Sequence, residues 1–298
     1  MGTPALSRLP LPTLAAMTNG ILVGAAIVAT RFVIGQSSPA ALALLRYTVG
    51  FGCLLIPLLL APRVRFARGD LLPIALLGIT QFGILITLLN YALQYIPSAR
   101  AALLFSSFPL LTMLIAAALG HERLTVYKSA GVLLTIVGVG FALGEKSLTL
   151  VESAQSWRGE IAVLLSALSG ALCSVLYRPY LRKYPALPMS AFAMLASVGF
   201  LAIFAAGEGF FNQPLHFTPG GWLSVLFIGL CSGVGYYLWL WALSRTAATN
   251  VTVFLALNPI TATVLGVLLL GERVTAQFLI GLVCVALGLW VAHWRARR

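Results

Sequence analysis

The sequence predicts an all-α integral membrane protein in which ten transmembrane helices form two inverted five-helix repeats. Three observations lead to this fold class. Only 9% of the 298 residues are charged and 60% are hydrophobic, whereas a soluble domain has about 25% charged residues. The apolar residues gather in ten runs, each close to the roughly 20 residues that a membrane-spanning helix needs. Finally, a set of short motifs recurs at a fixed spacing in the two halves of the chain.

The predicted helices follow one another with short connections. We expect them at 13–35, 39–60, 71–94, 98–119, 126–144, 159–182, 187–208, 220–244, 248–270 and 275–293. The longest predicted connection lies at the middle of the chain. The sequence therefore divides into a first repeat over 1–144, a central connecting loop over 145–158 and a second repeat over 159–298.

The repeat becomes visible when the chain is shifted by 150 residues against itself. Without a gap, the shift aligns Pro109 with Pro259, Glu122 with Glu272, Arg123 with Arg273, Thr125 with Thr275, Gly131 with Gly281 and Gly138 with Gly288. Because five is an odd number of helices, the second half enters the membrane from the side opposite to the first. Inverted repeats of this kind are typical of secondary transporters that work by alternating access.

The segments HERLT and GERVT contain the aligned Glu-Arg pairs and stand where one helix ends and the next begins. Thr125 and Thr275 are placed to cap the following helix. The acid and base can satisfy unpaired backbone groups at the hairpin. We therefore interpret Glu122 and Glu272 as structural residues rather than substrate ligands, with a gate contact as the alternative.

Basic residues are distributed unevenly between the two ends of the predicted helices. With a cytoplasmic N-terminus, thirteen of them fall inside, namely Arg8, Arg63, Arg65, Arg68, Arg123, Lys128, Arg178, Arg182, Lys183, Arg245, Arg295, Arg297 and Arg298. Four fall outside, namely Arg100, Lys146, Arg158 and Arg273. Lysine and arginine are enriched on the cytoplasmic side. We expect a multi-pass protein of a bacterial-type inner (plasma) membrane with both termini in the cytoplasm.

Several other classes fit the sequence less well. The net charge of +12 comes from basic residues between apolar runs, which argues against nucleic-acid binding. The four cysteines lie inside apolar runs without metal-ligand spacing, so we expect packing thiols and no metal or cofactor. A membrane enzyme needs converging nucleophile, base or metal ligands, and a channel needs a charged ring or a carbonyl filter. Neither pattern is visible, and the inverted repeat disfavours a structural or receptor bundle.

The ordered motifs resemble the drug/metabolite transporter superfamily, EamA type. Each half carries a helix with a central proline, then a GER-like turn, then a glycine-containing last helix; HERLT differs in placing His121 before Glu122, with Gly120 one place earlier. Within the superfamily the chain is most similar to the YddG-like amino-acid exporters. The resemblance implies export of small metabolites, helices 5 and 10 at the periphery, and a cavity lined by helices 1, 3, 4, 6, 8 and 9.

The candidate substrate site combines the two proline-containing helices with polar and aromatic neighbours. Pro109 and Pro259 each remove a backbone donor and free a carbonyl four residues earlier, and a broken helix can present such groups to a substrate. The candidates that add donors, acceptors or ring faces are Gln81, Thr87, Ser106, Ser107, Tyr177, Tyr237, Trp239 and Asn258. The alternative is a packed kink whose serines bond back to the helix.

The acidic residues all lie near predicted helix ends. We therefore expect no proton relay of buried acids, and either freed backbone carbonyls or aromatic rings, rather than a carboxylate, to hold a substrate ammonium. Arg46, deeper in the second helix, is a weaker candidate for a substrate carboxylate. The predicted function is export of neutral and aromatic amino acids, with broad specificity, across the lipid bilayer. A transporter of a drug cation or nucleotide sugar is the alternative, and a membrane-embedded enzyme is the alternative from another class.

Overall fold

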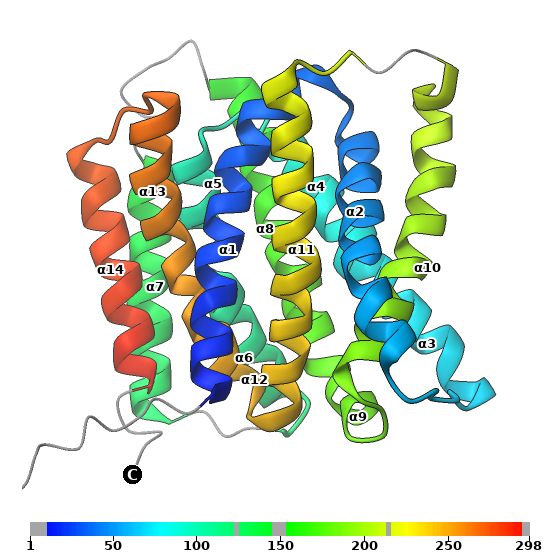
Figure 1. Cartoon of the computed structure of the whole chain (residues 1–298). Coiled ribbons are helices and arrows are strands. Elements are labelled where there is room, and N and C mark those ends of the chain that lie inside the picture. The colour runs from blue at the N-terminus through cyan, green and yellow to red at the C-terminus, as the bar shows by residue number, and fades with distance from the viewer. Residues whose placement is uncertain (1–10, 122–124, 145–152, 213–215, 294–298) are drawn as a thin grey trace, which may run out of the picture.

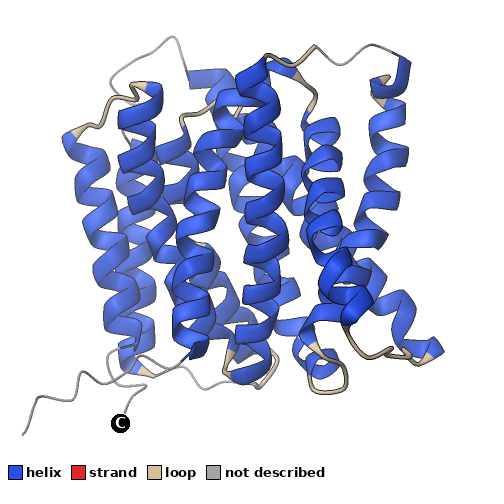
Figure 2. Ribbon diagram, in the orientation of Figure 1, coloured by secondary structure: helices blue, strands red, loops and turns tan. Residues whose placement is uncertain are grey.

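The computed structural model describes residues 11–121, 125–144, 153–212 and 216–293. Within these ranges the chain forms helices and connecting turns only (Figures 1 and 2). The α-helices are α1 (Leu11–Val33), α2 (Pro39–Leu60), α3 (Arg68–Gly78), α4 (Leu85–Ala92), α5 (Ser98–Phe105), α6 (Phe108–Ala118), α7 (Val126–Gly144), α8 (Ser153–Leu176), α9 (Arg178–Leu181), α10 (Ala186–Gly207), α11 (Pro219–Arg245), α12 (Ala248–Thr252), α13 (Leu257–Leu270) and α14 (Ala276–His293). Glu122 and Arg123 lie outside the described residues.

Each predicted span coincides with one helix or with a run of helices. A π-helical turn, Ile79–Ile84, joins α3 to α4 in the third span, and a 3-10 turn, Val253–Ala256, joins α12 to α13 in the ninth. Eight spans of the described chain are long and apolar enough to cross a membrane, and α7 and α14 contain shorter apolar stretches. The predicted fold class is confirmed.

The central connection is shorter than predicted. Helix α8 begins at Ser153, inside the segment expected to be a loop over 145–158. The stretch from 153 to 158 contains alanine, glutamine and arginine, which favour a helix. Residues 145–152 lie outside the described part of the chain.

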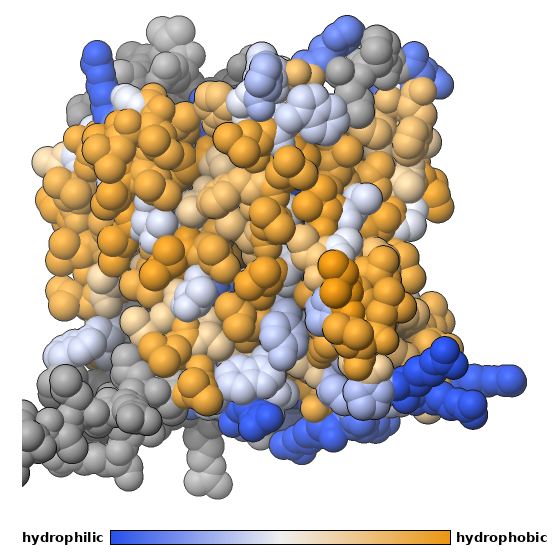
Figure 3. Space-filling view, viewed as in Figure 1, coloured by the Kyte–Doolittle hydropathy of each residue, from blue (hydrophilic) through white to orange (hydrophobic). Residues whose placement is uncertain are grey.

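The surface of the molecule matches a lipid environment. Figure 3 shows a broad hydrophobic band between more polar residues at the two ends of the helices. Large apolar side chains of the helices are exposed, among them Leu60, Ile203 and Leu268, which expose 84%, 78% and 73% of their surface. Side chains of this kind are stable when exposed to hydrocarbon, so the band marks the part of the protein that the bilayer surrounds.

The helix packing follows a pseudo-two-fold relation between the halves. Helix α1 packs against α11 and α13, and its counterpart α8 packs against α4 and α6. In the same way, α2 packs against α11 and α10 packs against α3. Helices α7 and α14 lie side by side at one edge (Figure 1), the peripheral position that the resemblance implies. Helices of each repeat thus pack against helices of the other.

Helices α2 and α11 approach each other closely through glycines. Gly229 and Gly233 of α11 have the GxxxG spacing that lets two membrane helices come together. A Cβ atom at Gly233 would lie 2.6 Å from the carbonyl oxygen of Gly50, and one at Gly229 would lie 2.5 Å from the Cβ of Val49. The glycines therefore bring this part of α2 close to the centre of the molecule.

The turns after the two proline-containing helices both use a left-handed glycine. Gly120 and Gly271 have φ angles of 70° and 64°, a conformation typical of helix C-termini and free of strain only for glycine. In the alignment without a gap His121 takes the position of Gly271, and the left-handed glycine of the first repeat stands one place earlier, at Gly120. Thr275 caps α14, because its Oγ1 accepts a hydrogen bond of 3.2 Å from the backbone N–H of Phe278. This cap was predicted.

Glu272 contacts the opposite repeat rather than its own hairpin. Its carboxylate accepts hydrogen bonds from the Ser98 backbone N–H (2.8 Å), the Ser98 hydroxyl (2.8 Å) and the Ala99 backbone N–H (3.1 Å). These donors are the unpaired groups at the start of α5. This contact agrees with the interpretation of Glu272 as a structural residue. The prediction that its partners are backbone groups of its own hairpin is wrong, because they lie at the start of α5.

Candidate functional site

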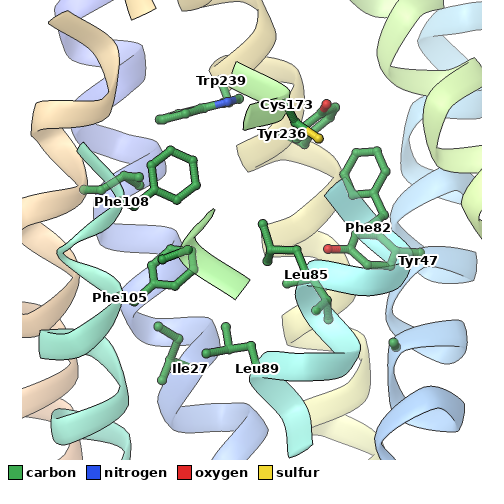
Figure 4. Close-up of a cluster of buried hydrophobic side chains, with 14 of the residues drawn as sticks. Ile27, Tyr47, Phe82, Leu85, Leu89, Phe105, Phe108, Cys173, Tyr236 and Trp239 are labelled. Atoms are coloured by element: carbon green, nitrogen blue, oxygen red, sulfur yellow. The ribbon is translucent and has the colours of Figure 1, made fainter. Parts of the chain in front are cut away.

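A small cavity of about 80 Å³ lies between the two halves of the chain. Aliphatic and aromatic side chains form most of its walls, and six of the lining residues are aromatic: Phe105, Phe108 and Trp239 lie on one side and Tyr47, Phe82 and Tyr236 on the other (Figure 4). The rings contact one another at their edges, with centroid distances of 5.9 Å between Phe108 and Trp239 and 4.2 Å between Phe82 and Tyr236. Such contacts fix the rings in place around the cavity.

The cavity lies on the pseudo-two-fold axis. Residues that correspond through the shift of 150 positions line it from opposite repeats, namely Phe82 with Ser232, Ile86 with Tyr236, Leu89 with Trp239 and Phe105 with Leu255. A site on this axis between inverted repeats can open to either side of the membrane in turn. The cavity is therefore the candidate transport site.

Both proline-containing helices break beside the cavity. In the fourth span α5 ends at Phe105, and α6 begins at Phe108 with Pro109 in its first turn. In the ninth span a 3-10 turn precedes α13, which has Pro259 in its first turn. Phe105 and Leu255, the residues four positions before the prolines, both line the cavity. The break arises because proline lacks the N–H that would continue the helix.

The structure brings some of the predicted site residues to the cavity. Gln81 and Trp239 line it. Ser106 is buried, and its hydroxyl donates to the Ala102 carbonyl at 3.0 Å, as in a packed kink. Ser107 and Asn258 are buried without lining the cavity, and neither the Ser107 hydroxyl nor the two polar side-chain atoms of Asn258 have a hydrogen-bond partner.

The remaining predicted residues lie outside the cavity lining. Pro109 and Pro259 are buried in the helix breaks. Tyr177 is buried at the end of α8, where its ring meets the ring of Tyr236 edge-on at 6.4 Å. Thr87 buries its hydroxyl, and Tyr237 is half-buried against the hydrophobic core.

Helix α2 lines the cavity, whereas no side chain in the described part of α8 does. The resemblance implied the opposite, a wall that includes the sixth helix and excludes the second. Arg46 and Tyr47 of α2 are among the lining residues, because the glycine contact with α11 brings α2 inward. Two features of the sequence could have indicated this wall: an arginine inside an apolar run, and the GxxxG segment GLCSG at 229–233, which favours close helix packing.

Arg46 is the charged side chain of the cavity wall. It is 6% exposed, and its Nε donates to the hydroxyl oxygen of Ser232, whose own proton goes to the Ile228 carbonyl at 2.6 Å. The guanidinium carbon lies 5.7 Å from the centroid of the Tyr47 ring. No aspartate or glutamate is among the described residues that line the cavity. An arginine inside a membrane span is costly, up to about 2.5–3.5 kcal/mol at the helix centre, so the position of Arg46 calls for a partner.

Comparison with known proteins identifies the family. The profile of the EamA-like transporter family matches residues 11–144 and 157–294. The chain belongs to this family. The EamA-like chain is 27% identical to the uncharacterized transporter YcxC of Bacillus subtilis (strain 168), over 92% of this chain and 90% of that one. It is therefore a membrane transporter.

Two further comparisons extend this result. A probable terminal-alkyne amino-acid exporter of Streptantibioticus cattleyicolor is 30% identical over 74% of the EamA-like chain and 71% of its own length. The chain also has the fold of a protein whose crystal structure has been solved. The two superpose with a TM-score of 0.74 and 23% sequence identity, over 94% of this chain and 97% of that one. The likeness to that structure concerns the fold alone.

Proposed function

We propose that this EamA-like transporter exports neutral and aromatic amino acids across a bacterial-type inner membrane by alternating access. The observation that carries the proposal is the aromatic cavity between the inverted halves, where Arg46 is the charged group and no described carboxylate opposes it. A zwitterion fits this wall, since the guanidinium suits a carboxylate and the ring faces suit an ammonium. The amino-acid exporter among the relatives supports the same substrate class.

The size of the cavity fits one stage of a transport cycle. The volume of about 80 Å³ is smaller than the roughly 300–1,000 Å³ that is typical of ligand pockets. Substrate entry therefore requires the helices that surround the cavity to move apart. We propose that the two repeats, 1–144 and 159–298, move relative to each other. This movement would separate Gln81 from Trp239 and the two broken helices from each other, and so widen the cavity.

Counterflow in proteoliposomes tests the proposal. Vesicles loaded with one unlabelled amino acid should take up labelled leucine, phenylalanine and tryptophan, and protein-free vesicles should not. Because an apolar pocket discriminates one methylene by only about 1–3 kcal/mol, the rates should differ modestly among these substrates. Uptake of organic cations or nucleotide sugars, with none of amino acids, would replace the proposal with another solute class.

We expect transport without an obligatory proton. No aspartate or glutamate is among the described cavity residues, and the buried Glu160 is paired with Arg100 at 2.9 Å. A pH gradient alone should therefore not drive uphill accumulation of a labelled amino acid in proteoliposomes. Accumulation that follows the gradient and disappears in Glu160→Gln would contradict this expectation and assign the coupling to that carboxylate.

The proposed orientation, with both termini in the cytoplasm, predicts a labelling pattern. Arg65 lies in the connection after α2 and Phe211 lies in the connection after α10, at opposite ends of the helices. Both side chains are exposed. In intact cells a membrane-impermeant thiol reagent should label Phe211→Cys and should label Arg65→Cys only after permeabilisation. The reverse pattern at both positions would invert the topology.

A further inference from the structure

We infer that Arg46 is the receptor for the carboxylate of the substrate, so that a free carboxylate is required for recognition. This inference rests on the proposed function, because it concerns how the same cavity selects its substrate. It starts from the position of Arg46. Arg46 is the seventh residue after Pro39, where α2 begins, which places it about 10 Å along the helix at about 1.5 Å per residue.

The guanidinium stays inside the protein. Long basic side chains near helix ends can extend their charge to the membrane surface, but Arg46 is 6% exposed and its Nε is bonded to Ser232 of α11. The described residues include no carboxylate within ion-pair distance of it. The charge is thus held within an apolar wall without a counter-ion from this part of the chain.

The hydrogen bond to Ser232 leaves the carboxylate-binding end of the guanidinium available. An arginine has five N–H donors, and only the Nε–H is used by a described residue. The other four belong to the two terminal nitrogens, which can hold the two oxygens of a carboxylate in a bidentate pair. Lysine lacks this planar fork.

The surroundings then select the rest of the substrate. Phe82, Phe108 and Trp239 provide ring faces and edges within the same cavity, which suit an apolar or aromatic side chain. Ser232 is a positioning residue, since its hydroxyl fixes the Nε of Arg46 while its proton is held by the Ile228 carbonyl. The glycine contact at Gly233 keeps α2 near enough for this bond.

Ligand chemistry tests the inference first in the wild-type protein. Binding is measured as the thermal stabilisation of the detergent-solubilised protein by added ligand. Phenylalanine and phenylacetate should bind, and phenylalaninamide and phenylacetamide should bind at least ten-fold more weakly. Equal binding of acid and amide, or no binding of either acid, would overturn the role of Arg46. Binding of both acids without counterflow of phenylalanine would instead refute amino-acid export and leave carboxylate recognition intact.

Variants test the residue itself. Arg46→Gln should weaken phenylalanine binding at least ten-fold and remove the preference for acid over amide, and Arg46→Lys should retain part of both. Ser232→Ala should weaken binding a few-fold with the preference kept. Arg245→Gln, the same change at an exposed arginine beside Trp241, is the matched control and should bind as the wild type does. A folded Arg46→Lys or Arg46→Gln protein with wild-type acid preference would overturn the inference.

Discussion

Replacement of Glu272 by glutamine is expected to destabilise the protein by about 1.5–3 kcal/mol, the range for hydrogen bonds to a charged group. The carboxylate accepts three hydrogen bonds from Ser98 and Ala99 at the start of α5. Glutamine keeps one acceptor oxygen and presents an amide NH₂ to the remaining donors, and it loses the favourable interaction of a negative charge with the helix N-terminus. Chemical unfolding in a fixed detergent measures the change.

The neighbouring arginine supplies the control for this prediction. Arg273→Gln alters an exposed side chain in the same turn and should change the free energy of unfolding by less than about 0.5 kcal/mol. If Glu272→Gln is as stable as the wild type but transports at a different rate, the contact is a gate rather than a structural cap. From the repeat alone, we expect Glu122→Gln to affect mainly stability as well.

The fold was predictable because the thickness of the membrane fixes the length of a spanning helix, so each apolar run of about 20 residues indicates one span. The boundaries of α2 and α7, at 39–60 and 126–144, agree with the predicted spans. Local rules also predicted the cap at Thr275 and the helix breaks before Pro109 and Pro259. The partner of Glu272 was not predictable in this way, since Ser98 lies 174 positions away in the sequence.

The site was predictable only in part, for a related reason. Trp239 and Gln81, two of the candidates chosen from the sequence, line the cavity. Ser106 looks like a ligand in sequence, but its hydroxyl satisfies the helix backbone instead. Arg46 reaches the cavity through the packing of α2 on Gly229 and Gly233. That contact joins segments about 180 residues apart, and the GxxxG spacing at 229–233 predicts a close helix contact without identifying α2 as the partner.

Asn258→Ala is expected to lower transport several-fold without loss of stability. Asn258 is completely buried, and its Nδ2 and Oδ1 have no hydrogen-bond partner. Leaving such groups unpaired costs about 1–3 kcal/mol, and their replacement by an apolar group can be neutral or stabilising. The shift of 150 positions pairs Asn258 with Phe108, which lines the cavity. If the inverted repeats exchange conformations as proposed, we expect Asn258 to take the corresponding place in the wall and to offer its amide to the substrate.

Asn90→Ala is the matched control, because Asn90 is also completely buried but its Nδ2 donates to the Pro39 carbonyl at 2.9 Å. We expect Asn90→Ala to destabilise the protein by about 1 kcal/mol through the lost hydrogen bond, whereas Asn258→Ala should unfold at or above the wild-type denaturant midpoint. Counterflow rates and unfolding midpoints, measured on the same preparations, separate the two effects. An Asn258→Ala protein that loses as much stability as Asn90→Ala and transports normally would show that the amide serves packing alone, and the exchange of wall residues between the two states would have to be abandoned.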